Sequence, residues 1–570
     1  MRWFPAADWL KSYSRSTFTA DLIAALIVTI MLIPQSLAYA MLAGVPPEVG
    51  LYASVLPLVA YALFGTSRTL SVGPVAVISL MTASAVGKAV NETGASYHEA
   101  AILLAFLSAV ILLGMGLCRF GFLANFLSHP VVSGFISASG IIIALSQLKH
   151  LLGISARGDT LIDLVDSLVV NLDQANVFTL GVGVFALVFL VWCRTYLPAS
   201  LVRLGCHKDL ASTLTKTAPV VAIAATIGLA YGFDLADKGV AIVGAVPSGL
   251  PTITLPSFDL RLIDELWSAA LLISIIGYVE SISVGRTLGA KRRQRVNPDQ
   301  ELIGLGAANF ASALSSGFPV TGGFSRSVVN FDAGAQTPAA SIMTAMGIAL
   351  AALFLTPVLF YLPKATLAAT IIVAVMSLVD LGLLKRAWNY SKRDGVALAG
   401  TIAVTLIAGV EAGVVTGVSL SIFLHLYHTS KPHVAIVGEV PGTQHFRNIN
   451  RHHVITEPTI CSIRVDESLY FPNAAYLEDV VYAQVAKNAE LKHVILMCSA
   501  INVIDLSALE ALEMINDRLG ELGIGLHLSE VKGPVMDALE RSHLLEGLNG
   551  QVYLSQHEAF VQLQPQKAPH

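Results

Sequence analysis

The segment at residues 318–331, FPVTGGFSRSVVNF, places two adjacent glycines and an arginine between apolar stretches long enough to cross a bilayer. Adjacent glycines interrupt helices, and a charged side chain is costly at membrane depth. A break at Gly322 and Gly323 would leave backbone N–H groups without helical partners at the start of the next helix. Arg326 would lie in the first turn of that helix, and Ser325 would add a hydroxyl donor. Since free N–H groups and a positive dipole end bind anions, this segment predicts half of an anion site.

A second break is predicted in the first half of the chain, within LSVGPVAV at residues 70–77. We expect Pro74, after Gly73, to lie in the first turn of a half-helix, where its missing N–H would be unsatisfied anyway. Broken helices in lipid must face protein or a water-filled cavity, so two opposed N-termini would form an anion site. Gly323 would let the backbone approach a ligand closely. The alternative is that both breaks are packing kinks, with Arg326 reaching an interface.

Two further polar side chains, Gln35 and Glu280, lie inside long apolar stretches. An intramembrane carboxylate marks a functional site by default. Glu280 could be a fixed partner for an arginine, or it could take and release a proton so that an anion travels with a proton, or it could do neither. Tyr39 follows Gln35 by four residues and therefore shares its helix face. Tyr39 could line a cavity, and an ordinary packing aromatic is the alternative.

The composition is that of a polytopic membrane protein. Of 570 residues, 54% are hydrophobic and 13% are charged, whereas soluble proteins carry about 25% charged residues. The five cysteines are scattered without a metal-binding spacing, and we expect neither a metal nor a cofactor. We find no nucleophile–base set that would indicate an enzyme. The net charge of −4 gives no sign of nucleic-acid binding, and the basic run at 291–295 is typical of an anchor at a membrane surface.

The chain divides into regions with different patterns. Residues 1–18 form a polar, basic N-terminal segment. About 14 apolar segments follow over residues 19–430, and several are too short to span as full helices. Strand and helix patterns then alternate at ordinary charge density, which predicts a small α/β domain and tail over residues 433–570.

Lysine and arginine predict the orientation in the membrane. They gather near the N-terminus and at 194–216, 291–295 and 385–393. With about 14 segments, all of these clusters can fall on the side that also holds the C-terminal domain. We therefore predict a cytoplasmic N-terminus and a cytoplasmic C-terminal domain, with the apolar region in the cell's inner (plasma) membrane.

An internal repeat connects the two halves of the apolar region. Residues 24–44 align without gaps with residues 269–289, an offset of 269 − 24 = 245. The aligned pairs include Gln35 with Glu280 and Ser36 with Ser281. Repeats of roughly 19–231 and 263–430 would begin at the first and eighth segments. Because an odd number of segments separates them, the second copy enters the bilayer from the opposite side, which predicts a 7+7 inverted repeat.

At these residues the chain resembles the sulfate permease (SulP) family of anion transporters. The resemblance is carried by IPQSLAYAMLAGVPPEVGLYASVLPLVAYALFGTSRTLSVGPVAVISLM and by GFPVTGGFSRSVVNFDAGAQTP. It covers nearly the whole chain, including a C-terminal domain similar to STAS domains. It implies a core domain that moves against a gate domain in an elevator-like cycle, within a homodimer. Where anti-sigma antagonists of the STAS type have a serine directly after an aspartate, Asp505 is followed here by Leu506 and only then by Ser507. Folding, dimer contact or binding of a cytosolic partner therefore fits that domain better than a kinase switch.

The resemblance also implies roles for individual residues. Segments one, three, eight and ten would build the substrate site. The substrate-binding residues would be Gln35, Tyr39, Val75, Phe324, Ser325 and Arg326. Glu280 matches the acidic residue that is linked to proton coupling in sulfate and dicarboxylate symporters. Its surroundings do not resemble the acidic, polar eighth segment of sodium-coupled bicarbonate members.

The predicted function is proton-coupled uptake of a small anion, with sulfate as the first candidate substrate. A dicarboxylate such as succinate or fumarate is the second candidate, and a bicarbonate carrier or anion exchanger is a rival within the same class. A membrane-tethered regulator, in which the STAS-like domain is the output, is a rival of a different class.

Overall fold

The computed structural model describes residues 4–125, 129–158, 160–205, 211, 215, 217–245 and 249–565. Lys208 and Lys216 of the second basic cluster, and Cys206, lie outside these residues. The chain forms two compact units, Met1–Ser421 and Ile422–His570. The division falls inside the last membrane-crossing helix, about ten residues before the boundary expected from the sequence at 430–433.

Seven apolar segments make up the first half of the larger unit. They are α2 (Arg15–Leu42), α3 with α4 (Pro47–Tyr52, Leu56–Phe64), β1 with α5 (Val72–Gly73, Ala76–Thr93), α6 (Tyr97–Leu117), α7 (His129–Leu152), α9 (Val177–Thr195) and α12 (Ala218–Gly232). Between and beside them lie α1 (Ala6–Leu10), the 3₁₀ helices η1 (Phe120–Asn125) and η2 (Leu172–Gln174), α8 (Leu161–Val170) and α10 (Leu197–Arg203).

Seven more segments follow. As in the first half, the third of them is a short strand followed by a half-helix. They are α13 (Leu260–Lys291), α14 (Pro298–Leu314), β2 with α15 (Thr321–Gly322, Phe324–Asp332), α16 (Ala339–Phe354), α17 (Lys364–Met376), α19 (Lys392–Ala408) and α20 (Val410–Ser430). The 3₁₀ helix η3 (Thr356–Tyr361) and α18 (Gly382–Tyr390) connect them. Seven of the described spans are long and apolar enough to cross a membrane. Helices α12, α14, α16, α17 and α19 have 13 to 17 residues each, in agreement with the expectation that several segments are too short to span as full helices.

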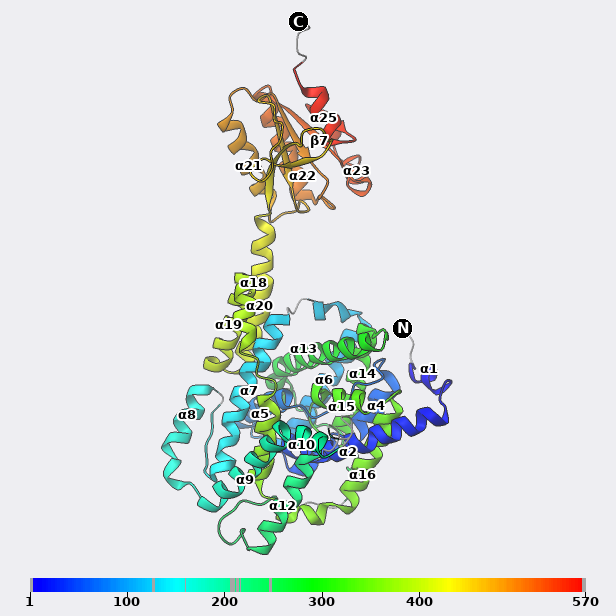
Figure 1. Ribbon diagram of the computed structural model, residues 1–570, viewed down its shortest axis with the longest axis vertical. Helices are drawn as coiled ribbons and strands as arrows, with labels where there is room; N and C mark the ends of the chain where they lie inside the picture. The colour runs from blue at the N-terminus through cyan, green and yellow to red at the C-terminus, as the bar shows by residue number, and fades with distance from the viewer. Residues whose placement is uncertain are drawn as a thin grey trace. The chain divides into compact units, whose positions relative to one another are not determined.

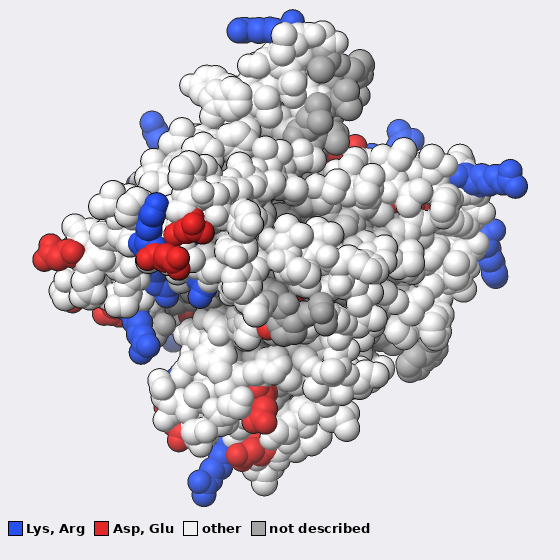
Figure 2. Space-filling model, turned by 90° about the horizontal axis from the view of Figure 1, so that it is seen from below, with Lys and Arg blue, Asp and Glu red and all other residues white. Residues whose placement is uncertain are grey.

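The membrane segments pack into two groups. In one group, α14 packs against α4 and α6, α16 against α2, and α13 against α5 and α6. In the other, α7 packs against α17 and α19, and α9 packs against α17 and α12. Contacts of α2 with α12 and α17 join the groups. Figure 1 shows these helices gathered into one bundle, and Figure 2 shows a face on which uncharged residues cover most of the surface. We refer to the first group as the core and to the second as the gate.

The two predicted breaks meet in space. Strand β1 pairs antiparallel with β2, with Val72 opposite Gly322 and Gly73 opposite Thr321. The two repeats cross the bilayer in opposite directions, so their strands run antiparallel where they meet. Helix α5 begins at Ala76, with Val75 as its N-cap. The prediction that Pro74 lies in the first helical turn is therefore wrong, because the preceding residues are held extended by the strand pair.

The second unit is an α/β domain (Figure 1). Its sheet has the order β4-β3-β5-β6-β7-β8, in which β5 to β8 are parallel and β3 is antiparallel to both neighbours. The strands are β3 (Val434–Glu439), β4 (Phe446–Asn448), β5 (Ile460–Val465), β6 (His493–Met497), β7 (Gly525–Ser529) and β8 (Val552–Tyr553). The helices are α21 (Ala474–Lys487), α22 (Leu506–Glu521), α23 (Gly533–Leu539), α24 (Leu544–Gly547) and α25 (Gln556–Leu563).

Side-chain alternation along the central strand explains the layers of this domain. Val494 and Leu496 on β6 join a core with residues of α21 to α24 on one face. Ile495 and Met497 on the same strand join Phe560 of α25 on the other face. Successive strand residues point to opposite faces, so a strand that is apolar throughout is buried on both sides.

Candidate functional site

The strand pair brings the starts of two half-helices together. After Gly73 and Gly322 the chains continue into α5 and α15, whose N-caps are Val75 and Gly323. The first helical bonds run from Ser79 N–H to the Val75 carbonyl and from Ser327 N–H to the Gly323 carbonyl. The N–H groups of the residues between cap and bond have no partner within their own helix. The break therefore presents two sets of donors and two positive dipole ends at one place.

A polar scaffold on α13 and α14 holds β2 in position. The Gly322 N–H donates to Ser281 Oγ at 2.8 Å, and the Thr321 hydroxyl lies 2.8 Å from the same oxygen and 2.6 Å from the Gly277 carbonyl. The Asn309 side chain bonds both the N–H and the carbonyl of Val320, each at 2.9 Å. The broken backbone is thus satisfied by protein, as it must be at membrane depth.

Arg326 lies behind the break and packs against its glycines. It is 2% exposed, and its Nη2 donates to the carbonyls of Gly73 at 2.6 Å and Thr321 at 2.9 Å. A Cβ on Gly73 would come within 2.8 Å of Nη1, and a Cβ on Gly323 within 2.8 Å of Nε. Neither Nε nor Nη1 has a hydrogen-bond partner among the described residues. The arginine therefore clamps the two breaks together and retains two unused donors.

An open cavity of about 450 Å³ lies between core and gate, next to the first turn of α15. From the core it is lined by Gln35 of α2 and by Phe324 and Ser325 of α15. From the gate it is lined by residues of α9, α12 and α17. Phe324 and Ser325 are exposed to it, whereas Arg326, one residue further on, is not among its lining residues. The structure thus brings Gln35, Phe324 and Ser325 to one wall.

Tyr39 and Glu280 are not among the residues that line this cavity. Both interact electrostatically with Arg326, and Tyr39 also interacts with Glu280. Glu280 lines a separate void of about 30 Å³ among apolar residues of α5, α7, α13 and α20. Within the described residues, Glu280 and Arg326 form no direct ion pair. The fixed arginine partner that the sequence allowed for Glu280 is therefore absent from the described residues in this conformation.

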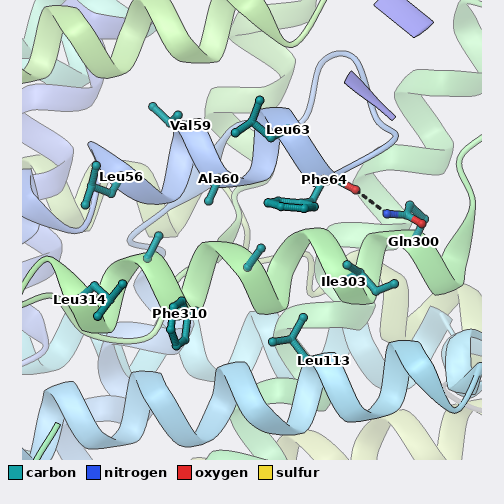
Figure 3. Close-up of a pocket in the computed structure, with 12 residues that line it drawn as sticks. Leu56, Val59, Ala60, Leu63, Phe64, Leu113, Gln300, Ile303, Phe310 and Leu314 are labelled. Atoms are coloured by element: carbon teal, nitrogen blue, oxygen red, sulfur yellow. Dashed lines mark hydrogen bonds between the residues drawn. The ribbon is translucent and has the colours of Figure 1, made fainter. Parts of the chain in front are cut away.

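A more voluminous space, about 580 Å³, is a groove between α4, α6 and α14. Figure 3 shows Leu56, Leu63, Phe310 and other apolar side chains along it. The single amide in view, that of Gln300, is used internally, since its Nε2 donates to the Phe64 carbonyl at 2.9 Å. An anion would lose its hydration there and gain no donor, so the groove does not suit one.

Sequence reasoning missed two kinds of residue. Ser281 and Asn309 position the break, and only the repeat alignment had drawn attention to Ser281. Arg194 lines the cavity from α9, although its place in a basic cluster had suggested a surface anchor. The described residues contain no group of three or more histidine, cysteine, aspartate or glutamate side chains that could hold a metal.

Comparison with known proteins identifies related sequences and folds. The profile of the sulfate permease family matches residues 18–401, and that of the STAS domain matches residues 453–559. Sulfate transporter 4.1, chloroplastic, from Arabidopsis thaliana is 36% identical over 557 residues, covering 95% of this chain and 80% of that protein. High affinity sulfate transporter 2 from Stylosanthes hamata is 30% identical over 582 residues, covering 99% and 87%.

The structure superposes on that of the murine Slc26a9 anion transporter in the inward-facing state with a TM-score of 0.88. The two share 24% sequence identity, and the match covers 98% of this chain and 94% of that one. The transmembrane domain of the cyanobacterium bicarbonate transporter BicA matches with a TM-score of 0.61 at 20% identity, covering 71% and 98%. These likenesses confirm the predicted fold: a helical membrane region followed by a STAS domain.

Proposed function

The chain belongs to the sulfate permease family of anion transporters, and on that premise we propose that it takes up sulfate together with protons. The observation that carries the proposal is the meeting of two half-helix N-termini at the β1–β2 pair, beside a cavity lined by Gln35 and Ser325. An oxyanion accepts hydrogen bonds from several directions, which suits two sets of backbone donors. The names of the sulfate-transporting relatives support sulfate as the substrate.

In this proposal the core carries the site. The Gln35 amide and the Tyr39 hydroxyl contact the anion through their side chains. The N–H groups near Val75 and those of Phe324 and Ser325 surround it. Arg326 contributes positive charge from behind the break, where it is buried against the glycines.

Glu280 is the proposed site of proton coupling. It interacts with Arg326 without pairing directly with it, so loss or gain of its charge changes the field at the anion site. A protonated Glu280 would leave the charge of Arg326 available to the anion. An ionised Glu280 would compete with the anion for it. Proton binding and anion binding would then favour each other.

Core and gate supply the two bodies of an elevator-like cycle. The cavity lies at the boundary between them, so a shift of the core along the gate would move the site from one membrane face to the other. We further propose an inner-membrane location, a homodimer, and cytoplasmic placement of the N-terminus and the STAS domain, where that domain would contact a second copy or a cytosolic partner. Basic clusters on one side of the segments support the orientation.

Uptake of radiolabelled sulfate, succinate and bicarbonate into proteoliposomes tests the proposal. Each anion is measured with and without an inward proton gradient, for the wild type, Glu280→Gln and the control Glu99→Gln, whose carboxylate is exposed at the start of α6. We expect the gradient to accelerate sulfate uptake in the wild type and the control, but not in Glu280→Gln.

Other outcomes would point to the rival functions. Acceleration of succinate alone would assign a dicarboxylate. Dependence on sodium or on a counter-anion would assign a bicarbonate carrier or an exchanger. Anion binding without flux would favour a tethered regulator. Flux that ignores the gradient in every variant would refute proton coupling through Glu280.

A further inference from the structure

The charge that faces the cavity comes from the gate. Among the described residues that line the cavity, Arg194 alone is charged, whereas Arg326 is buried behind the break. Arg194 lies in the last turn of α9, and its side chain is exposed. Its Nη1 donates to the Val373 carbonyl of α17 at 2.9 Å, which holds the guanidinium at the junction of two gate helices. Arginine presents five N–H donors, so this single bond leaves others for a ligand.

The donors of the core line the same cavity. Ser325 at the first turn of α15 and Gln35 of α2 lie on the wall formed by the core, and Arg194 belongs to the wall formed by the gate. A small oxyanion in the cavity would therefore have neutral donors on one side and a full positive charge on the other. Guanidinium groups suit sulfate and carboxylate because their N–H groups match the spacing of two oxygens.

Chain direction shows at which membrane face the cavity opens. The lining residues come from the end of α9, the start of α12 and the end of α17. Counting crossings from α2, the ends of the sixth and twelfth segments and the start of the seventh all fall on the face at which α2 begins. Arg194 thus lies at the mouth of the cavity in the conformation that is open to the face of the N-terminus.

We propose that Arg194 is a further anion-binding residue, which contacts the anion from the gate in this conformation only. The proposal rests on the proposed transport function and deepens it. Because α9 belongs to the gate, a core that carries its anion toward the other face leaves Arg194 behind. The residue would then raise anion affinity at the face of the N-terminus without affecting affinity at the opposite face. Anions accumulated at that face would occupy the cavity and slow further uptake.

The test compares Arg194→Gln, Arg194→Lys and Arg203→Gln with the wild type. Arg203 is an exposed arginine of α10 on the same side of the gate and does not line the cavity, so it controls for the change in net charge. Radiolabelled sulfate flux is measured in vesicles of each orientation at several ionic strengths, and equilibrium sulfate binding is measured on purified protein without any gradient.

We expect Arg194→Gln to raise KM at the face of the N-terminus on the order of tenfold, because the anion loses its attraction to one charge. The dependence of KM on ionic strength should also weaken, because salt screens that attraction in a water-filled cavity. KM at the other face should stay within about twofold of the wild type, inhibition by accumulated sulfate should weaken, and Arg194→Lys should recover part of the affinity. Arg203→Gln should match the wild type.

Equal KM values and salt slopes for the Arg194 and Arg203 variants would overturn the inference. So would a fall in maximal rate with unchanged KM, which is the mark of a merely structural role. A flux that ignores the proton gradient would refute the proposed coupling, while the binding constant would still report on Arg194. Wild-type protein that binds none of the anions would overturn both proposals.

Discussion

Alanine at residue 73 tests whether the arginine clamp at the break is required for transport. The added Cβ would lie 2.8 Å from Nη1 of Arg326, inside the roughly 3.5 Å at which such atoms normally touch. The guanidinium must move, and with it Nη2, whose bond to the Gly73 carbonyl is 2.6 Å long. A hydrogen bond from a charged group contributes about 1.5 to 3 kcal/mol. Losing it corresponds to roughly a 10- to 150-fold change in an equilibrium.

Gly87→Ala is the matched control for this substitution. Gly87 belongs to α5, the half-helix that follows Gly73, and a Cβ there would meet nothing within 4 Å. Alanine inside a helix is favoured over glycine by about 0.5 to 1 kcal/mol. We therefore expect Gly87→Ala to transport normally and to unfold at the same or a slightly higher temperature. Gly73→Ala should lose at least about tenfold in kcat/KM for anion uptake and should unfold at a lower temperature.

The assay is initial-rate uptake into proteoliposomes, with thermal unfolding of the same purified variants. The decisive quantity is the difference between the two glycine variants, because both add one methyl group to the same segment. If Gly73→Ala transports and unfolds like Gly87→Ala, the guanidinium is not held against the break, and the structural role assigned to Arg326 is incorrect.

Two other predictions concern positions away from the cavity. Ser281→Ala should lower the free energy of unfolding by about 1 to 3 kcal/mol, because it leaves the buried Gly322 N–H without its acceptor. Ser283→Ala, which removes only a bond to a carbonyl of its own helix, should change it little, and equal effects in thermal or denaturant unfolding would contradict this reasoning. In the STAS domain, burial and then the neighbouring His493 lower the pKa of His527 from 6.5 to about 4. The His527 side chain therefore binds a proton more readily in the unfolded chain than in the folded domain. The contribution of neutral His527 to the free energy of unfolding is complete above pH 6.5, and it falls by about 3 kcal/mol as the pH drops toward 4. Urea unfolding of a fragment that begins at residue 432 should show this slope, and His527→Asn should reduce it; identical slopes would exclude His527 as its source.

Much of the fold followed from local patterns in the sequence. The order of apolar segments, the two breaks and the strand–helix alternation after residue 433 each depend on neighbouring residues, through hydrophobic periodicity and through glycine and proline chemistry. The start of α15 directly after Gly323 was predicted in this way. The half-helix was predicted to start after Gly73 and Pro74, with Pro74 suited to its first turn. Helix α5 begins at Ala76 and leaves Pro74 outside, because the preceding residues form a strand that depends on its partner β2.

The tertiary structure decided what each charged residue faces. In the sequence Arg326 belongs to the predicted anion site and Arg194 to a surface cluster. In the folded chain Arg326 is buried against Gly73, and Arg194 faces the cavity. Gly73 and Arg326 are separated by 253 residues, so their contact arises from packing between the two repeats and leaves no local periodicity to detect. Residue type and spacing determined which side chains could bind an anion, and through-space packing decided which of them reach the cavity where it would bind.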